Sequence, residues 1–162
     1  MKKNIRVILA GEFILLAALF VFSVVLCSED PGSAIAWFAD IPSLLIILLV
    51  LIPGLIIMGE WKDFVKSFSV GIKSYSLLEL KNIIGAVGAA QKLTVYGALL
   101  AIITSAVLLL GRLGDPSTIG PNLAVCFLSG FYALIMEFLL LPLRLNAERK
   151  MNQEMDMEDG EA

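Results

Sequence analysis

Four long apolar runs constrain this chain more than any other feature of its sequence. They cover Val7–Cys27, Ile41–Met58, Leu93–Leu110 and Leu123–Leu143, with 18 to 21 residues and at most one charged side chain each. A bilayer core about 30 Å thick needs roughly 20 helical residues, so every run is long enough to cross it. Backbone polar groups cannot go unpaired in lipid, which makes the runs helices. The sequence therefore predicts an all-α, multi-pass membrane protein with four transmembrane helices.

The composition excludes several other classes of protein. Of the 162 residues, 59% are apolar and 17% are charged, whereas soluble domains have about 45–50% and about 25%. The chain has no His, and Cys27 and Cys126 lie far apart, which leaves no Cys/His metal site, His-based triad or disulfide framework. We therefore expect no enzyme, cofactor or metal ion. We also expect the first run to be retained, because it is too long for the apolar part of a secretion signal and Glu12 interrupts it.

The basic residues predict the orientation of the spans. Eleven of the 12 Lys and Arg residues precede the first run, separate the second from the third, or follow the fourth; only Arg112 lies elsewhere. By the positive-inside rule, both termini and the middle loop are cytoplasmic. The net charge of −3 comes from the last twelve residues, which carry five acids and no base. Nothing in this charge pattern suggests binding to nucleic acid.

We divide the chain into four parts. Residues 1–59 are expected to form a lipid-facing hairpin of the first two spans. Residues 60–92 hold a short amphipathic helix, with an apolar stripe from Trp61 to Ile72, and the start of a long third helix. Residues 93–145 form an inner hairpin of the third and fourth spans. Residues 146–162 form an acidic cytoplasmic tail that we expect to be disordered.

Capping and proline signals predict where several helices begin and end. Asp40-Ile41-Pro42-Ser43 is typical of a helix start. Ser76-Leu77-Leu78-Glu79 is a capping box that opens a helix over Leu77–Arg112. Asp115 is expected to cap a short turn that begins at Pro116, and Gly120-Pro121 to break that turn before the fourth span.

Small and polar residues form stripes on the third and fourth spans. The third span carries Gly97, Ala101 and Ser105, with Thr104 beside them; the fourth carries Asn122, Cys126, Gly130, Ala133 and Glu137, with Ser129 adjoining. In lipid such stripes mark either close helix contacts or a polar path, and the sequence leaves both interpretations open.

Glu137 is the only ionisable residue well inside this pair of spans. A charge at mid-depth costs at least about 2.5–3.5 kcal/mol on insertion scales, so the residue needs a specific role. It lies either beside an ion path or in a structural or interfacial position, where it could pair with Arg144 or with a neighbouring subunit. Glu12, near the start of the first span, is expected to reach the membrane surface or to be paired.

The stretch LGDPSTIGPNLAV at residues 113–125, followed by Phe131 and Tyr132, resembles the outer-loop and fourth-span signature of the flagellar stator subunit MotA. MotA belongs to the MotA/TolQ/ExbB family of proton-channel proteins. Residues 40–44 (DIPSL) are similar to the start of its second span. The structural residues that this resemblance marks are Asp115, Pro116, Gly120, Pro121 and Asn122, together with Pro142 as the proline that ends the fourth span.

The resemblance implies a homopentameric ring in the bacterial inner membrane. Five subunits would surround two copies of a single-span partner, similar to MotB, ExbD or TolR, whose aspartate carries the ion. The third and fourth spans would form the inner layer of the ring. The residues that this arrangement places along the ion path or against the partner are Ala101, Thr104, Ser105, Ser129, Gly130 and Glu137.

The chain also departs from the MotA pattern. The family's Gly-Thr pair in the third span falls on Ala101 and Ile102, and a proline falls on Val95. Of two threonines in the fourth span, the first matches Ser129 and the second is Gly130. The loss of hydroxyl groups favours protons over sodium ions. Because the middle loop is short, we expect the family's torque-generating cytoplasmic domain to be absent.

Two functions remain open from the sequence. The first is a subunit of an ion-driven stator or motor, which converts ion-motive force into rotation or other mechanical work. The alternative is a non-conducting structural membrane scaffold of the same fold. A membrane enzyme has no nucleophile–base or metal constellation to support it.

Overall fold

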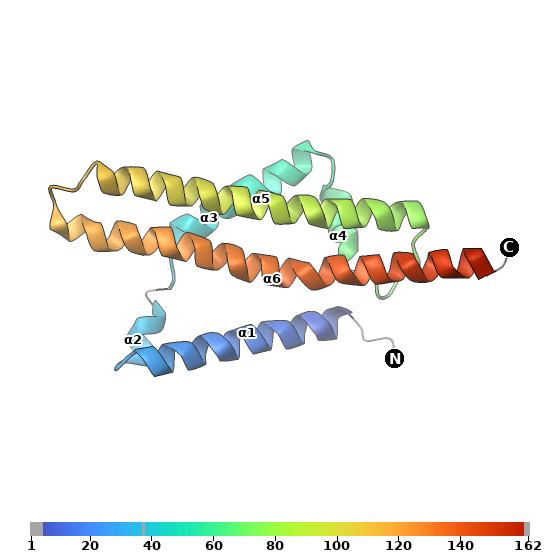
Figure 1. Ribbon diagram of the computed structural model, residues 1–162, viewed down its shortest axis with the longest axis horizontal. Coiled ribbons are helices and arrows are strands. Elements are labelled where there is room, and N and C mark those ends of the chain that lie inside the picture. The colour runs from blue at the N-terminus through green and yellow to red at the C-terminus, as the bar shows by residue number, and fades with distance from the viewer. Residues whose placement is uncertain (1–4, 37, 161–162) are drawn as a thin grey trace.

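The computed structural model describes residues 5–36 and 38–160, which contain six helices (Figure 1). These helices are α1 (Ile5–Cys27), α2 (Pro31–Ala36), α3 (Ile41–Ile57), α4 (Trp61–Ser67), α5 (Leu77–Leu110) and α6 (Pro116–Gly160). Four segments, which lie in α1, α2–α3, α5 and α6, are long and apolar enough to cross a membrane. The chain is thus an all-α, multi-pass membrane protein, as the sequence predicts.

The antiparallel pair α5–α6 is the centre of the fold and makes its most extensive helix contact (Figure 1). The helix α3 crosses α5 obliquely, and α1 runs along α6. Within the described residues, α1 and α3 make no close contact with each other. Within residues 1–59, α1 therefore packs on α6, and α3 packs on both α5 and α6. The link between them is held on α6, because the Tyr132 hydroxyl bonds to backbone groups of Phe38 and Asp40.

The two ends of the molecule differ in charge. The basic end comprises α4, the first turns of α5 and the last turns of α6, and the opposite end carries α2 and the α5–α6 turn (Figure 1). The described cations at the basic end are Lys62, Lys66, Lys73, Lys81, Lys92, Arg144, Arg149 and Lys150. Arg112 lies at the opposite end, in the α5–α6 turn. The fold thus gathers side chains that the sequence spreads over 89 positions.

Two predicted helix starts are confirmed. At Ser76 the hydroxyl accepts a hydrogen bond from the Glu79 amide (3.4 Å), and the Glu79 carboxylate accepts one from the Ser76 amide (3.1 Å). The helix that this capping box opens ends at Leu110, close to the expected Arg112. The helix α3 begins after Asp40 with Pro42 in its first turn, where the missing N–H has no helical partner to lose.

The helix α6 corrects three expectations. It runs unbroken from Pro116 to Gly160, so Gly120-Pro121 does not interrupt it and Pro142 does not end it. Each proline removes one backbone hydrogen bond, and neighbouring helices and local adjustments compensate for such losses in membrane helices. The acidic tail, expected to be disordered, is helical as far as Gly160. Its Met, Gln and Glu residues favour helix, and Lys150 pairs with Glu154 at 3.6 Å.

The buried core lies near the basic end, where four helices meet. One cluster contains Leu51, Leu55, Val87, Ala90, Leu140 and Leu143. A second cluster, which we call the lower cluster, contains Val70, Leu80, Ile83 and Ala147, with Met151 packed against it. By contrast, only 6% of the apolar span in α1 is buried, so this helix presents nearly all of its side chains to the surroundings.

The amphipathic segment of the middle loop is only partly helical. The helix α4 ends at Ser67, and turns follow as far as Ile72. Phe68 and Ile72 therefore lie beyond the helix whose apolar stripe the sequence predicts.

Candidate functional site

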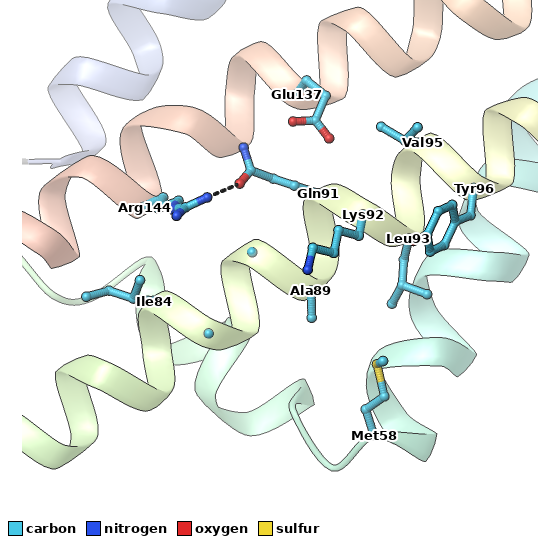
Figure 2. A pocket seen from close by; sticks show the side chains of 12 residues that line it. Met58, Ile84, Ala89, Gln91, Lys92, Leu93, Val95, Tyr96, Glu137 and Arg144 are labelled. Atoms are coloured by element: carbon cyan, nitrogen blue, oxygen red, sulfur yellow. Dashed lines mark hydrogen bonds between the residues drawn. The ribbon is translucent and has the colours of Figure 1, made fainter.

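A groove of about 770 Å³ lies between α5 and α6 at the basic end (Figure 2). We call it the α5–α6 groove. Its lining includes Gly85, Gly88, Gln91 and Lys92 from α5, and Glu137 and Arg144 from α6. Met58, which follows α3, also contributes to its wall. The groove thus combines apolar walls with several polar groups in a membrane-spanning pair of helices.

Glu137 is the polar group in this groove that lacks a partner. Its Oε1 atom is buried and has no hydrogen-bond partner among the described residues. Figure 2 shows the carboxyl group directed toward α5, between Gln91 and Val95. Buried polar atoms in proteins nearly always find a partner, which can be water or another chain. Oε1 is therefore free to accept a hydrogen bond from a group outside the protomer.

Arg144, one of the partners considered for Glu137, is engaged elsewhere. Its Nε atom donates to Glu148 at 2.9 Å, and its Nη1 atom donates to the Gln91 side chain at 3.4 Å. Among the described residues, no ion pair involves Glu137. Pairing with Arg144 is thus not the arrangement in this structure.

Gly85 and Gly88 give the groove an open surface on α5. A Cβ atom added at either position would meet no atom within 4 Å. Glycine in a helix interior costs about 1 kcal/mol relative to alanine. At Gly97 on the same helix, close packing explains the glycine, because a Cβ atom there would lie 2.9 Å from the Ile47 Cα on α3. Among the described residues, no atom packs against Gly85 or Gly88 in this way.

The structure separates the residues expected along the ion path. Ala101, Ser105 and Ser129 are buried inside the protomer, whereas Thr104 is exposed and Gly130 is half-buried beside open space. Of the six, only Glu137 lines the α5–α6 groove. The buried members of the stripes contribute to close packing between helices, one of the two interpretations that the sequence leaves open.

Ser129 belongs to a hydrogen-bonded group near the opposite end. Its hydroxyl lies 3.0 Å from the Ser43 hydroxyl and 2.8 Å from the Val125 carbonyl oxygen. Ser43 in turn donates to the Asp40 carboxylate. The sequence predicts no role for the Ser43 and Tyr132 side chains, although both lie in stretches that carry the resemblance. Their long-range contacts leave no periodic signal in the sequence.

The motif residues make local contacts. Asp115 accepts hydrogen bonds from the Ser117 hydroxyl at 2.6 Å and, as a cap requires, from the Ser117 amide at 3.1 Å, and these bonds lower the pKa of its carboxyl group. The Asn122 side chain donates to the Thr118 carbonyl oxygen at 2.9 Å. Gly120 and Pro121 are exposed, and Pro142 is buried. These residues shape α6 and line no groove described above.

The polar groups of the groove are the Glu137 carboxylate, the Gln91 amide and the cations of Lys92 and Arg144. The carboxylate can accept a hydrogen bond from a ligand or from a helix that carries a donor. The described residues hold no group of three or more His, Cys, Asp or Glu that could bind a metal ion. Comparison of the chain with protein families, with curated proteins and with solved structures gives no match.

Proposed function

We propose that this chain is the ring subunit of a MotA-like, ion-driven membrane complex, and that its α5–α6 groove receives the transmembrane helix of a MotB-, ExbD- or TolR-like partner. Protons are the favoured ion, and ion flow drives rotation or other mechanical work. The ring is a homopentamer in the bacterial inner membrane. Its basic end faces the cytoplasm, because Lys and Arg gather on that side of membrane proteins.

The observation that carries this proposal is the unpartnered Oε1 atom of Glu137 in the groove. An acid at this depth is costly and marks interior or functional positions of membrane proteins. A partner helix with a hydrogen-bond donor or a protonated acid at the same depth would satisfy it. The open faces of Gly85 and Gly88 support the same occupant, because small residues let helix backbones approach closely.

A specific observation also supports the alternative function, a non-conducting scaffold of the same fold. Ala101 and Ser129 are fully buried and Ser105 is 7% exposed within one protomer, so these side chains are not free to line a channel. The two functions differ in whether ions cross the membrane, and an ion-flux measurement separates them.

The test uses the full chain, co-expressed with a single-span protein that carries an acid in its span and is encoded beside it. Co-purification reports on complex formation, and a pH-sensitive dye inside reconstituted vesicles reports on proton flux. The variant is Glu137→Gln, and the matched control is Glu12→Gln. Glu12 also has a buried oxygen without a partner among the described residues, so it is not paired there, but it lies on α1 outside the α5–α6 groove.

We expect the wild-type complex to conduct protons, Glu137→Gln to lower flux at least tenfold or to weaken the complex, and Glu12→Gln to do neither. A stable complex without flux overturns the motor function and favours the scaffold. If Glu137→Gln and Glu12→Gln give the same proton flux and the same co-purification, the proposed role of Glu137 is wrong. An image of the purified particle that shows single protomers, or a ring with no room on its axis, overturns the ring.

A further inference from the structure

The segment from Trp61 to Lys73, which we call the α4 segment, has two apolar sides. Its inner side is buried: Phe64 packs against the first core cluster, and Val70 belongs to the lower cluster. Its outer side exposes four large apolar residues to 38–55% of their full area, namely Trp61, Val65, Phe68 and Ile72. A short segment that already packs on the core has no internal reason to expose these residues.

The outer side continues the lipid-facing surface of α3. The last turn of α3 exposes Ile56 and Ile57 to 57% and 86% of their full area. Gly59, with φ of 76°, then turns the chain directly into α4. Because α3 is a membrane-crossing helix, its exposed apolar side chains face acyl chains. The exposed residues of the α4 segment begin where this lipid-facing surface ends.

The aromatic side chains hold the exposed tryptophan in place. The rings of Trp61 and Phe64 lie 6.2 Å apart, and those of Phe64 and Phe68 lie 5.7 Å apart in an edge-to-face arrangement. Phe64 thus links the buried side of the segment to its exposed side. Tryptophan is enriched at the membrane–water boundary, where its ring sits at the level of the headgroups.

The free charge of the α4 segment is positive. Lys66 pairs with Asp63 at 2.8 Å and with Glu79 at 3.7 Å. Lys62 and Lys73 are exposed and form no ion pair with the described residues. Apolar side chains next to unpaired lysines are typical of helices that lie in the plane of an anionic membrane surface.

We propose that the α4 segment is an interfacial anchor for anionic phospholipids. Trp61, Val65, Phe68 and Ile72 enter the boundary between headgroups and acyl chains of the leaflet at the basic end. Lys62 and Lys73 contact the lipid phosphates. This anchor is independent of the ring and of ion conduction, and it would hold the start of α5 at a fixed depth.

The first test locates Trp61 in the bilayer. The full chain is reconstituted in vesicles whose lipids carry bromine either near the headgroup or near the chain end, and Trp fluorescence is compared between wild type and Trp61→Phe. The difference isolates Trp61 from Trp37, which lies outside the described residues. We expect the Trp61 component to be quenched at least twofold more by the shallow bromines. If aqueous acrylamide quenches Trp61 and the bromine-labelled lipids do not, the proposed anchor is wrong. If neither acrylamide nor the lipids quench Trp61, the anchor is also wrong, and the exposed surface instead contacts a neighbouring protein.

The second test concerns the headgroup. Thermal stability is measured in phosphatidylcholine vesicles and in vesicles that also contain phosphatidylglycerol. We expect phosphatidylglycerol to raise the melting temperature of the wild type and of the control Arg112→Gln, which removes an exposed cation at the opposite end. Lys62→Gln/Lys73→Gln should lose at least half of this rise. A rise that is equal in all three proteins overturns the contact between these lysines and lipid phosphate.

Discussion

Ser129 of α6 and Ser43 of α3 share a hydrogen bond of 3.0 Å across 86 positions of sequence, and both side chains are fully buried. The bond joins the central helix pair to α3 close to the point where α3 begins. Because Ser43 also donates to Asp40, the pair fixes the link between α2 and α3 as well. Ser129, which the resemblance to MotA places along the ion path, thus helps to hold the helices of one protomer together.

Replacement of Ser129 should therefore lower the stability of the protomer. Ser129→Ala removes one buried hydrogen bond, which costs about 0.6–1 kcal/mol in a membrane protein. Ser129→Leu also overfills the site and costs about 1–3 kcal/mol. Unfolding in a mixed-detergent titration measures both. The control Ser23→Leu changes an exposed serine of α1 and should leave the unfolding free energy unchanged; an equal loss in both Leu variants contradicts the role of the buried pair.

Gly97→Ala should destabilise the α3–α5 contact. The new Cβ would lie 2.9 Å from the Cα and 3.2 Å from the carbonyl oxygen of Ile47. These are backbone atoms that cannot rotate away, so one helix must shift, at a cost of about 1–3 kcal/mol. Gly88→Ala is the matched control, because its Cβ meets nothing within 4 Å and alanine favours helix by about 1 kcal/mol. Melting temperatures that fall for Gly97→Ala and hold or rise for Gly88→Ala are expected, and the reverse order contradicts the packing.

Glu137→Leu should stabilise the isolated protomer. The substitution removes a buried oxygen without a partner, and such an atom costs about 1–3 kcal/mol. The same change should abolish complex formation if the groove receives a partner helix. Unfolding in detergent and co-purification with the partner measure the two effects on one variant. A loss of stability in the protomer alone would show that the carboxyl group already has a partner there.

The cap at Asp115 gives a prediction that depends on pH. Hydrogen bonds from Ser117 lower the pKa of the Asp115 carboxyl group in the folded protein below its value in the unfolded chain. The contribution of this cap to folding stability is therefore fully present above the pKa of the unfolded chain, and it is lost as the pH falls through the pKa of the folded protein. The Ser117 amide resonance in an NMR titration should follow this single ionisation. Asp115→Asn keeps an acceptor and should remove the titration while it preserves the first turn of α6. A Ser117 resonance that still titrates in Asp115→Asn assigns the change to another group.

The helices were largely predictable because lipid leaves the backbone few choices. Apolar length located all four spans, and the Ser76–Glu79 spacing located the start of α5 within a residue. The continuity of α6 was not predictable from Gly120-Pro121, since local rules for proline describe helices in water. A membrane helix keeps its hydrogen bonds wherever it can.

The candidate site was predictable only in part. Glu137 stood out as an acid in an apolar run, but its neighbours Gln91 and Gly88 belong to a helix 46–49 positions away. Their proximity depends on the register between α5 and α6, which side-chain packing sets. For the same reason the hydroxyl residues of the stripes could not be assigned to an inner or outer face from their spacing alone.

Truncation distinguishes the two parts of the helical tail. A chain that ends after Met151 keeps the lower cluster, because Ala147 is fully buried in it and Met151 packs against it. We expect this chain to unfold and assemble like the full chain, since residues 152–157 belong to neither core cluster. A chain that ends after Asn146 loses both contacts and leaves Val70, Leu80 and Ile83 partly uncovered. At about 0.8 kcal/mol per buried CH₂ group, that loss should reach about 2–3 kcal/mol. Limited proteolysis at Lys73 and Lys81 measures the opening of the lower cluster, and equal protection in the two truncated chains would show that the tail does not support it.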